Sequence, residues 1–158
     1  MKKTRILCIS AIIAAIYVVV MYFTQSFAFG AYQIRIATCL YSMSYFFPFL
    51  ILPLGFANLL SNFLFGGLGM LDIIGGALVG FVTGGGVYLV KRFRLSDLFV
   101  IPIIIFAPGL IVPIWISYIL ELPYVALAVS ICIGQIIPAV AGYFLIKTLS
   151  KIKIEQLS

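Results

Sequence analysis

Two oppositely charged residues, Arg35 and Asp72, interrupt otherwise apolar sequence in this 158-residue chain. The guanidinium of Arg35 could make forked hydrogen bonds to a carboxylate, a pair of carbonyls or the edge of a heterocycle, or it could anchor the chain at lipid headgroups. The carboxylate of Asp72 could cap a helix N-terminus. We expect both on the same side of the protein, where they either form a structural pair or bind opposite edges of a ligand.

Three amide side chains could extend such a site. Asn58 and Asn62 are four residues apart and so share one face of a helix, and Gln135 lies in the middle of a long apolar stretch. An amide that faces lipid is penalised, so we expect all three to point inward. Each offers both donors and acceptors, which suits a neutral heterocycle, although hydrogen bonds between helices are an equally good use.

Aromatic side chains could supply a stacking surface for a flat ligand. Tyr41, Tyr45 and Trp115 are expected in the outer halves of their helices. The alternative is a place in the aromatic belt at the membrane surface.

Residues for catalysis or for holding a metal are missing from the sequence. The chain has no histidine, and its cysteines, Cys8, Cys39 and Cys132, lie in apolar runs without metal-ligand spacing. No Gly-x-x-x-x-Gly-Lys-Ser/Thr loop occurs that could cradle the phosphates of ATP. We therefore expect neither an enzyme nor a protein with a metal or another cofactor.

The composition indicates an all-α membrane protein that forms a single domain over residues 1–158. Hydrophobic residues make up 65% of the chain and charged residues 9%. Apolar runs of about 20 residues match a hydrocarbon core of about 30 Å. We predict six transmembrane helices, with a break at Pro53-Leu54-Gly55 between the second and the third. Their expected ranges are 6–24, 37–52, 54–66, 71–91, 98–120 and 123–149.

Basic residues cluster at the ends of the predicted helices, which accounts for the net charge of +6 without a role for nucleic acid. Positive charge marks the cytoplasmic ends of membrane helices. A multi-pass protein of the cell membrane with both termini in the cytoplasm puts all three clusters on the inside. The clusters are Lys2, Lys3 and Arg5; Lys91, Arg92 and Arg94; and Lys147, Lys151 and Lys153.

Small residues recur at helical spacing in two places. Ala11, Ala14 and Ala15 occur within two turns of the first helix, and Ala11 and Ala15 share one face. A face of this kind lets another helix approach closely, either within the protein or from a partner. Gly76, Gly80 and Gly84 form a longer groove, which we interpret as internal packing.

Three stretches resemble the substrate-binding (S) components of energy-coupling factor (ECF) transporters, in particular the queuosine-precursor transporter family, QueT. Residues 29–36 (Phe-Gly-Ala-Tyr-Gln-Ile-Arg-Ile) resemble that family's loop after the first helix. Residues 62–73 resemble its Asn…Gly-rich…Leu-Asp segment, and Ala11-x-x-x-Ala15 resembles its docking face.

The resemblance implies a six-helix bundle that captures a queuosine precursor or a related vitamin-like heterocycle outside the cell. Its partners would be a transmembrane coupling subunit, docked on Ala11, Ala14 and Ala15, and two ATPase subunits. The implied binding residues are Gln33, Arg35, Thr38, Tyr41, Tyr45, Asn58, Asn62, Asp72, Trp115 and Gln135. Two alternatives stay open: a stand-alone carrier that couples uptake to an ion through Asp72, and an assembly protein without a small ligand.

One departure from the family pattern affects the choice of substrate. Where the family's loop carries a glutamate soon after its arginine, this chain has Thr38. The change removes a charge-assisted contact of about 1.5–3 kcal/mol to a cationic group. A neutral or anionic heterocycle therefore fits Arg35 and Thr38 better than a cationic aminomethyl-deazaguanine does.

Overall fold

The computed structural model describes residues 3–66 and 68–152, and every regular element in that part of the chain is helical. The α-helices are α1 (Lys3–Ala28), α2 (Ile51–Ser61), α3 (Met70–Arg92), α4 (Val100–Leu120), α5 (Tyr124–Gly134) and α6 (Ile136–Lys151). The 3₁₀ helices are η1 (Ile36–Tyr45), η2 (Pro48–Leu50) and η4 (Asp97–Phe99), and η3 (Asn62–Gly66) is a π-helix.

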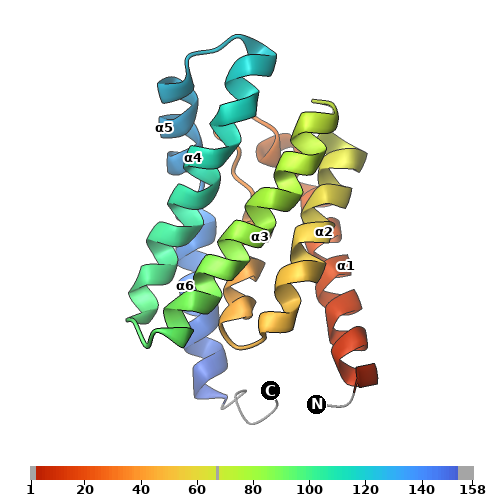
Figure 1. Ribbon diagram of the computed structural model, residues 1–158, viewed down its shortest axis with the longest axis vertical. Helices are drawn as coiled ribbons and strands as arrows, with labels where there is room; N and C mark the ends of the chain where they lie inside the picture. Colours follow the sequence, from red (N-terminus) through yellow and green to blue (C-terminus); the bar gives the residue numbers. More distant parts are fainter. Residues whose placement is uncertain (1–2, 67, 153–158) are drawn as a thin grey trace.

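The helices run along the long axis of one bundle (Figure 1). The start of α1, the end of α3 and the end of α6 lie together at the bottom of the view, and we call this the basic end because the basic clusters flank these helices. The loop after α1, the start of α3 and the turn between α4 and α5 lie toward the opposite end, which we call the site end. The described chain therefore begins and finishes at the basic end.

Five helical stretches in the described residues are long and apolar enough to cross a membrane: Lys3–Ala28, Pro48–Gly66, Met70–Arg92, Asp97–Leu120 and Tyr124–Lys151. Large apolar side chains such as Leu7, Phe23 and Ile137 are exposed on the outside of the bundle, as expected for a surface that faces lipid. The prediction of an all-α membrane protein is confirmed, and five of the six predicted spans have the necessary length.

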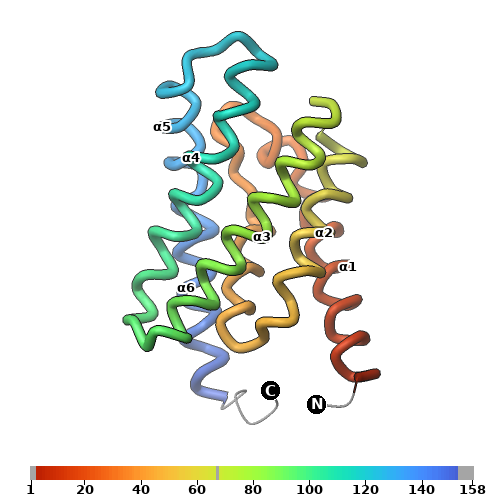
Figure 2. Tube along the Cα trace, in the orientation of Figure 1, coloured from red at the N-terminus to blue at the C-terminus, as the bar shows by residue number. Residues whose placement is uncertain are grey.

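The 3₁₀ helix η1 takes the place of the first part of the predicted helix over 37–52. Figure 2 shows the chain descending from the site end to the basic end through this segment. A 3₁₀ helix rises about 2.0 Å per residue, so its ten residues cover roughly 20 Å, less than a hydrocarbon core of about 30 Å. Because Ala37, Tyr41 and Ser44 are fully buried, η1 is a central strut wrapped by the other helices.

The predicted break at Pro53-Leu54-Gly55 is wrong, because the chain turns earlier, at Phe46 and Phe47. Pro48 pushes the preceding Phe47 out of the helical region, to φ −125° and ψ 81°. Pro53 instead lies in the first turn of α2, where a missing N–H leaves no hydrogen bond unmade.

The last predicted helix, 123–149, is divided at Gln135 into α5 and α6. Pro138 has no N–H to donate to the carbonyl of Gly134, four residues earlier, so the helix cannot continue unbroken through this point. The interruption places the Gln135 side chain, which is completely buried, at the centre of the bundle.

α2 and α3 approach closely where two glycines meet. A Cβ atom built on Gly80 of α3 would lie 2.8 Å from the Gly55 Cα of α2 and 2.9 Å from the Tyr41 hydroxyl of η1. Real Cβ atoms do not come this close to backbone, so only glycine fits here. The predicted internal packing role of this glycine row is confirmed at Gly80.

A pair of glycine substitutions on one helix tests this contact. Gly80→Ala should destabilise the purified protein by about 1–3 kcal/mol, because the added methyl forces α2 away from α3. Gly85→Ala is the matched control: a Cβ there meets no atom within 4 Å. It should leave stability unchanged or raise it by up to about 1 kcal/mol through helix propensity. Thermal unfolding in detergent measures both, and equal effects would contradict the packing described.

Candidate functional site

Arg35 is buried at the site end, directly before η1, with 5% of its surface exposed. Its Nη1 donates to the Oδ1 atoms of both Asn58 and Asn62, at 3.1 Å each. The guanidinium carbon also lies 4.9 Å from the centre of the Phe29 ring. Two amides of one helix thus hold the arginine in place, while its Nε–H, also buried, has no partner.

The same two asparagines tie α2 to α3. Asn58 Nδ2 donates to the Gly76 carbonyl at 2.7 Å, and Asn62 Nδ2 donates to the Asp72 carbonyl at 2.8 Å. Each amide therefore uses its oxygen for Arg35 and its nitrogen for the backbone of α3. Both point inward as predicted, and they link helices at the same time as they line the site.

Asp72 lies in the first turn of α3 and is 1% exposed. Its Oδ1 accepts a hydrogen bond from Trp115 Nε1 of α4 at 3.1 Å, and its Oδ2 has no partner. Gly69 is the residue at the helix N-cap, and Asp72 does not cap the helix with its side chain. In the described part of the chain no salt bridge joins Asp72 to Arg35, since the amides occupy the guanidinium instead.

Gln135 holds the opposite wall of the site. Its Nε2 donates to the Gln33 carbonyl at 2.8 Å, and its Oε1 lies 2.9 Å from the Thr38 hydroxyl. That hydroxyl also contacts the Arg35 carbonyl. Because a hydroxyl has one proton, Thr38 can donate to only one of these two acceptors at a time.

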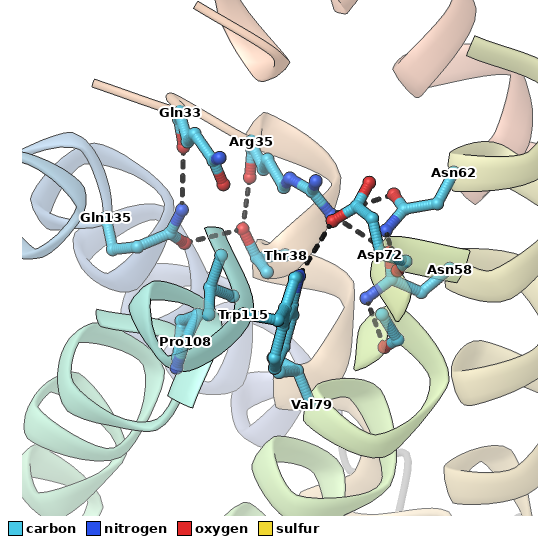
Figure 3. A pocket seen from close by; sticks show the side chains of 12 residues that line it. Gln33, Arg35, Thr38, Asn58, Asn62, Asp72, Val79, Pro108, Trp115 and Gln135 are labelled. Carbon is cyan, nitrogen blue, oxygen red and sulfur yellow. Dashed lines mark hydrogen bonds between the residues drawn. The ribbon is translucent and has the colours of Figure 1, made fainter. Parts of the chain in front are cut away.

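Eight of the ten side chains predicted to bind a substrate line one cavity at the site end (Figure 3). They are Gln33, Arg35, Thr38, Asn58, Asn62, Asp72, Trp115 and Gln135. The cavity measures about 10 Å³, which is the room that one water molecule needs. Any larger ligand must therefore displace side chains or segments of the wall.

Tyr41 and Tyr45 do not reach this cavity. Tyr41 is fully buried deeper in the bundle, where its hydroxyl lies 3.3 Å from that of Tyr17. Tyr45 donates to Asp97 Oδ1 at 2.7 Å, and Asp97 forms a salt bridge of 3.1 Å with Lys147 at the basic end. Since η1 descends from Arg35, a residue ten positions later lies at the far end of the strut, so the prediction that Tyr45 lies at the same end of the protein as Arg35 is wrong.

Four lining residues were not predicted to touch a ligand: Gly76, Val79, Pro108 and Val112. Gly76 gave a signal as part of the glycine row. A Cβ on it would lie 2.4 Å from Asn62 Nδ2, so its lack of a side chain makes room for the amide. Gly75 does the same for the Trp115 ring, at 2.6 Å. Pro108 stands out in the sequence as a proline within a predicted helix, whereas nothing in the sequence distinguishes Val79 and Val112 from other apolar residues.

The cavity presents three buried polar atoms without a partner: Gln33 Oε1, Arg35 Nε and Asp72 Oδ2. Two are acceptors and one is a donor, so a ligand with matching donors and an acceptor would satisfy all three. A buried polar atom without a partner costs about 1–3 kcal/mol, and more if it is charged. Among the described residues no three His, Cys, Asp or Glu side chains gather as a metal site would require.

A double-mutant cycle tests the link between Arg35 and Asn58. Asn58→Leu should destabilise the protein by about 1–3 kcal/mol, because it removes an acceptor from a buried cation. Adding Arg35→Leu to that variant should cost less than Arg35→Leu costs in the wild type, since neither group is then left unpaired. Ser61→Ala, which removes a hydroxyl bonded only to its own helix at Ala57, is the control and should change little. Strictly additive losses in thermal unfolding would refute the coupling.

The chain matches a protein-family model but no individual known protein. No curated protein and no solved structure matches the chain. The family model described as QueT transporter matches residues 7–151, which include every residue of the site and every helix of the bundle except the first four residues of α1. The chain therefore belongs to the QueT transporter family, as its resemblance to that family predicted.

Proposed function

We propose that this protein is the substrate-binding component of an ECF-type transporter and that it captures a deazaguanine-type queuosine precursor at the Arg35–Asp72 cavity. The family supports transport of a queuosine precursor. The observation that carries the choice of site is the set of three unpartnered polar atoms on Gln33, Arg35 and Asp72. Groups of this kind inside a membrane protein are costly and mark substrate pathways.

The donor and acceptor pattern of these atoms matches the edge of a guanine ring. A guanine carries a carbonyl oxygen, which accepts, beside a ring N–H and an exocyclic amino group, which donate. The carbonyl would face the Nε–H of Arg35, and the two donors would face Asp72 Oδ2 and Gln33 Oε1. The Trp115 ring, held by its bond to Asp72, offers a flat surface against the heterocycle.

The expected docking face for a coupling subunit is an open apolar groove. Ala11, Ala14 and Ala15 of α1 line it together with residues of α2 such as Ala57 and Leu60. Its volume is about 510 Å³, enough to admit side chains from a foreign helix. Small residues along its floor would let that helix approach closely. The two ATPase subunits would then supply the energy, since the chain has no phosphate-binding loop of its own.

The proposed orientation places the basic end in the cytoplasm and the site outside. Lys3, Arg92 and Lys151 bound the helices at the basic end, whereas Arg35 and Asp72 lie toward the other. Positive charge at cytoplasmic ends favours this arrangement. Both termini would then face the cytoplasm.

One observation supports a second candidate, a stand-alone carrier coupled to an ion. The unpartnered Oδ2 of the buried Asp72 carboxylate could take up a proton or a cation during a transport cycle. Uptake into vesicles that hold this chain alone, driven by an ion gradient, would favour this candidate. Uptake that needs the ATPase subunits and ATP favours the ECF mechanism.

Ligand binding should depend on the two charged residues of the cavity. A deazaguanine at 100 times its Kd should stabilise the wild-type protein by about 2.7 kcal/mol in a thermal-shift measurement. Arg35→Ala and Asp72→Asn should lose most of this stabilisation. Asp97→Asn, which removes a carboxylate at the basic end, is the matched control and should keep it. Full stabilisation of both site variants would show that the site is wrong, and mass spectrometry of co-purified molecules identifies the natural ligand independently.

Docking should depend on the small residues of α1 without affecting binding. Replacing Ala11 and Ala15 together by leucine should abolish uptake by cells, because the larger side chains fill the groove. The ligand-induced thermal shift of the isolated variant should remain. Ala141→Leu, at an exposed alanine of α6 outside this groove, is the control and should transport normally. Loss of binding in the double variant, or normal uptake by it, would contradict the docking role.

A further inference from the structure

A second and much larger cavity, which we call the vestibule, lies at the site end. It measures about 400 Å³ and is bounded by the loop after α1, the end of η3, the end of α4 and the start of α5. Representative lining residues are Phe29, Gln33, Gly66, Ile116, Leu127 and Ile131.

The vestibule and the Arg35–Asp72 cavity meet at two points. Gln33 lines both of them. Gly66 lines the vestibule, and a Cβ atom built on it would lie 3.0 Å from the unpartnered Asp72 Oδ2. The carboxylate oxygen that lacks a partner therefore lies close to a residue of the vestibule wall, so the two compartments adjoin at Gln33 and Gly66.

Gln33 combines a backbone that is held by hydrogen bonds with a side-chain oxygen that makes none. Its φ of 44° lies in the left-handed region, which costs a non-glycine residue about 1–3 kcal/mol and persists only where the surroundings impose it. The backbone is held from both sides: its N–H donates to the Gly30 carbonyl at 3.0 Å, and its carbonyl accepts from Gln135 Nε2 at 2.8 Å. In contrast, the side-chain Oε1 has no partner. This side chain, which lines both compartments, can therefore rotate without breaking a hydrogen bond to Oε1.

The lining of the vestibule is apolar and has no anionic group among its described residues. Apart from Gln33, the polar side chain there is Ser130, whose hydroxyl already donates to the Ala31 carbonyl at 2.9 Å. The Asp72 carboxylate, which lies close to this wall, is assigned to the heterocycle in the proposed function, so an ammonium group here would lose water without a counter-charge of its own. A neutral substituent meets no such penalty.

We propose that the ligand occupies both compartments: the Gln33 side chain rotates to admit it and then accepts a hydrogen bond from it through Oε1, the polar edge of the heterocycle binds Arg35 and Asp72, and a neutral substituent fills the vestibule. This inference rests on the proposed function, because it assumes a deazaguanine-type ring in the inner cavity. It adds the place of the substituent, the residue that separates the compartments, and the selection of uncharged over cationic substituents.

Three probes separate this inference from the proposed function: 7-deazaguanine, 7-cyano-7-deazaguanine and 7-aminomethyl-7-deazaguanine. Binding of each to the full-length protein is measured by calorimetry. The unsubstituted ring tests the inner site, and its failure to bind would refute the proposed function itself. If the ring binds, the cyano compound should bind at least about tenfold more tightly than the cationic aminomethyl compound. Equal affinities would overturn the vestibule's selectivity while leaving the proposed function intact.

A carboxylate placed in the vestibule should reverse this preference. Ala126 is an exposed residue of α5 that lines the vestibule, and Ala126→Asp should improve the affinity for the aminomethyl compound relative to the cyano compound by about tenfold. Val125→Asp is the matched control on the neighbouring residue, which is 70% exposed and does not line the vestibule. It should leave the ratio unchanged, and the same ratio in both variants would overturn the location of the substituent.

The role of Gln33 at the boundary between the inner cavity and the vestibule is tested by measuring the rate of ligand association. Gln33→Ala should speed the association of the cyano compound several-fold, because no side chain then has to rotate out of the way. An unchanged association rate would overturn this role. The wild-type preference between the two substituted probes involves no variant, so it tests the selectivity even if a substituted protein fails to fold.

Discussion

A buried guanidinium needs hydrogen-bond acceptors, and this requirement at Arg35 organises the site end of the bundle. Lipid offers none, so the acceptors must come from the protein. Asn58 of α2 and Asn62, the first residue of η3, supply them from successive helical turns, and their nitrogens then bond the backbone of α3. One cation thereby fixes the rotation of α2 about its axis and its position along α3. The loop that carries Arg35 is held to two helices at once.

Close packing of the helices follows from these bonds. An asparagine side chain is short, so it can reach both Arg35 and a carbonyl of α3 only if the helix backbones are near each other. Gly76 leaves space for the Asn62 amide, and the Gly55–Gly80 contact brings the axes together further along. The narrow 3₁₀ strut η1 fits in the centre, where Gly84 and Gly142 face its Ser44 and Ser42 side chains. A full α-helix would be wider and would hold Arg35 at another height.

The sequence predicts side-chain chemistry here better than it predicts the path of the chain. Asn58 and Asn62 share a face whether their helix begins at residue 51 or 54, so their inward orientation could be predicted. The division at Gln135 is marked in the sequence by Pro138, but a proline alone does not show whether a membrane helix bends or is interrupted. Tyr45 was misplaced because ten residues span roughly 20 Å as a 3₁₀ helix but roughly 15 Å as an α-helix, so the 3₁₀ helix carries it further from Arg35. Val79 and Val112 are typical of any apolar helix, so only coordinates reveal their place in the cavity wall.

The way in which Arg35 and Asp72 are kept from pairing explains how one cavity can be both stable and selective. A direct salt bridge would satisfy both charges and leave nothing for a ligand to complete. Here the two asparagines accept hydrogen bonds from Arg35, and Trp115 donates one to Asp72, which lowers the cost of burying both charges. One atom of each charged group is left without a partner. A molecule that lacks one matching donor or acceptor leaves a buried atom without a partner, and sites that bond a substrate in this way reject such analogues strongly. In the proposed function, selectivity would come from the atoms that the fold leaves unsatisfied, and the stability that they cost would be recovered when the correct ligand binds.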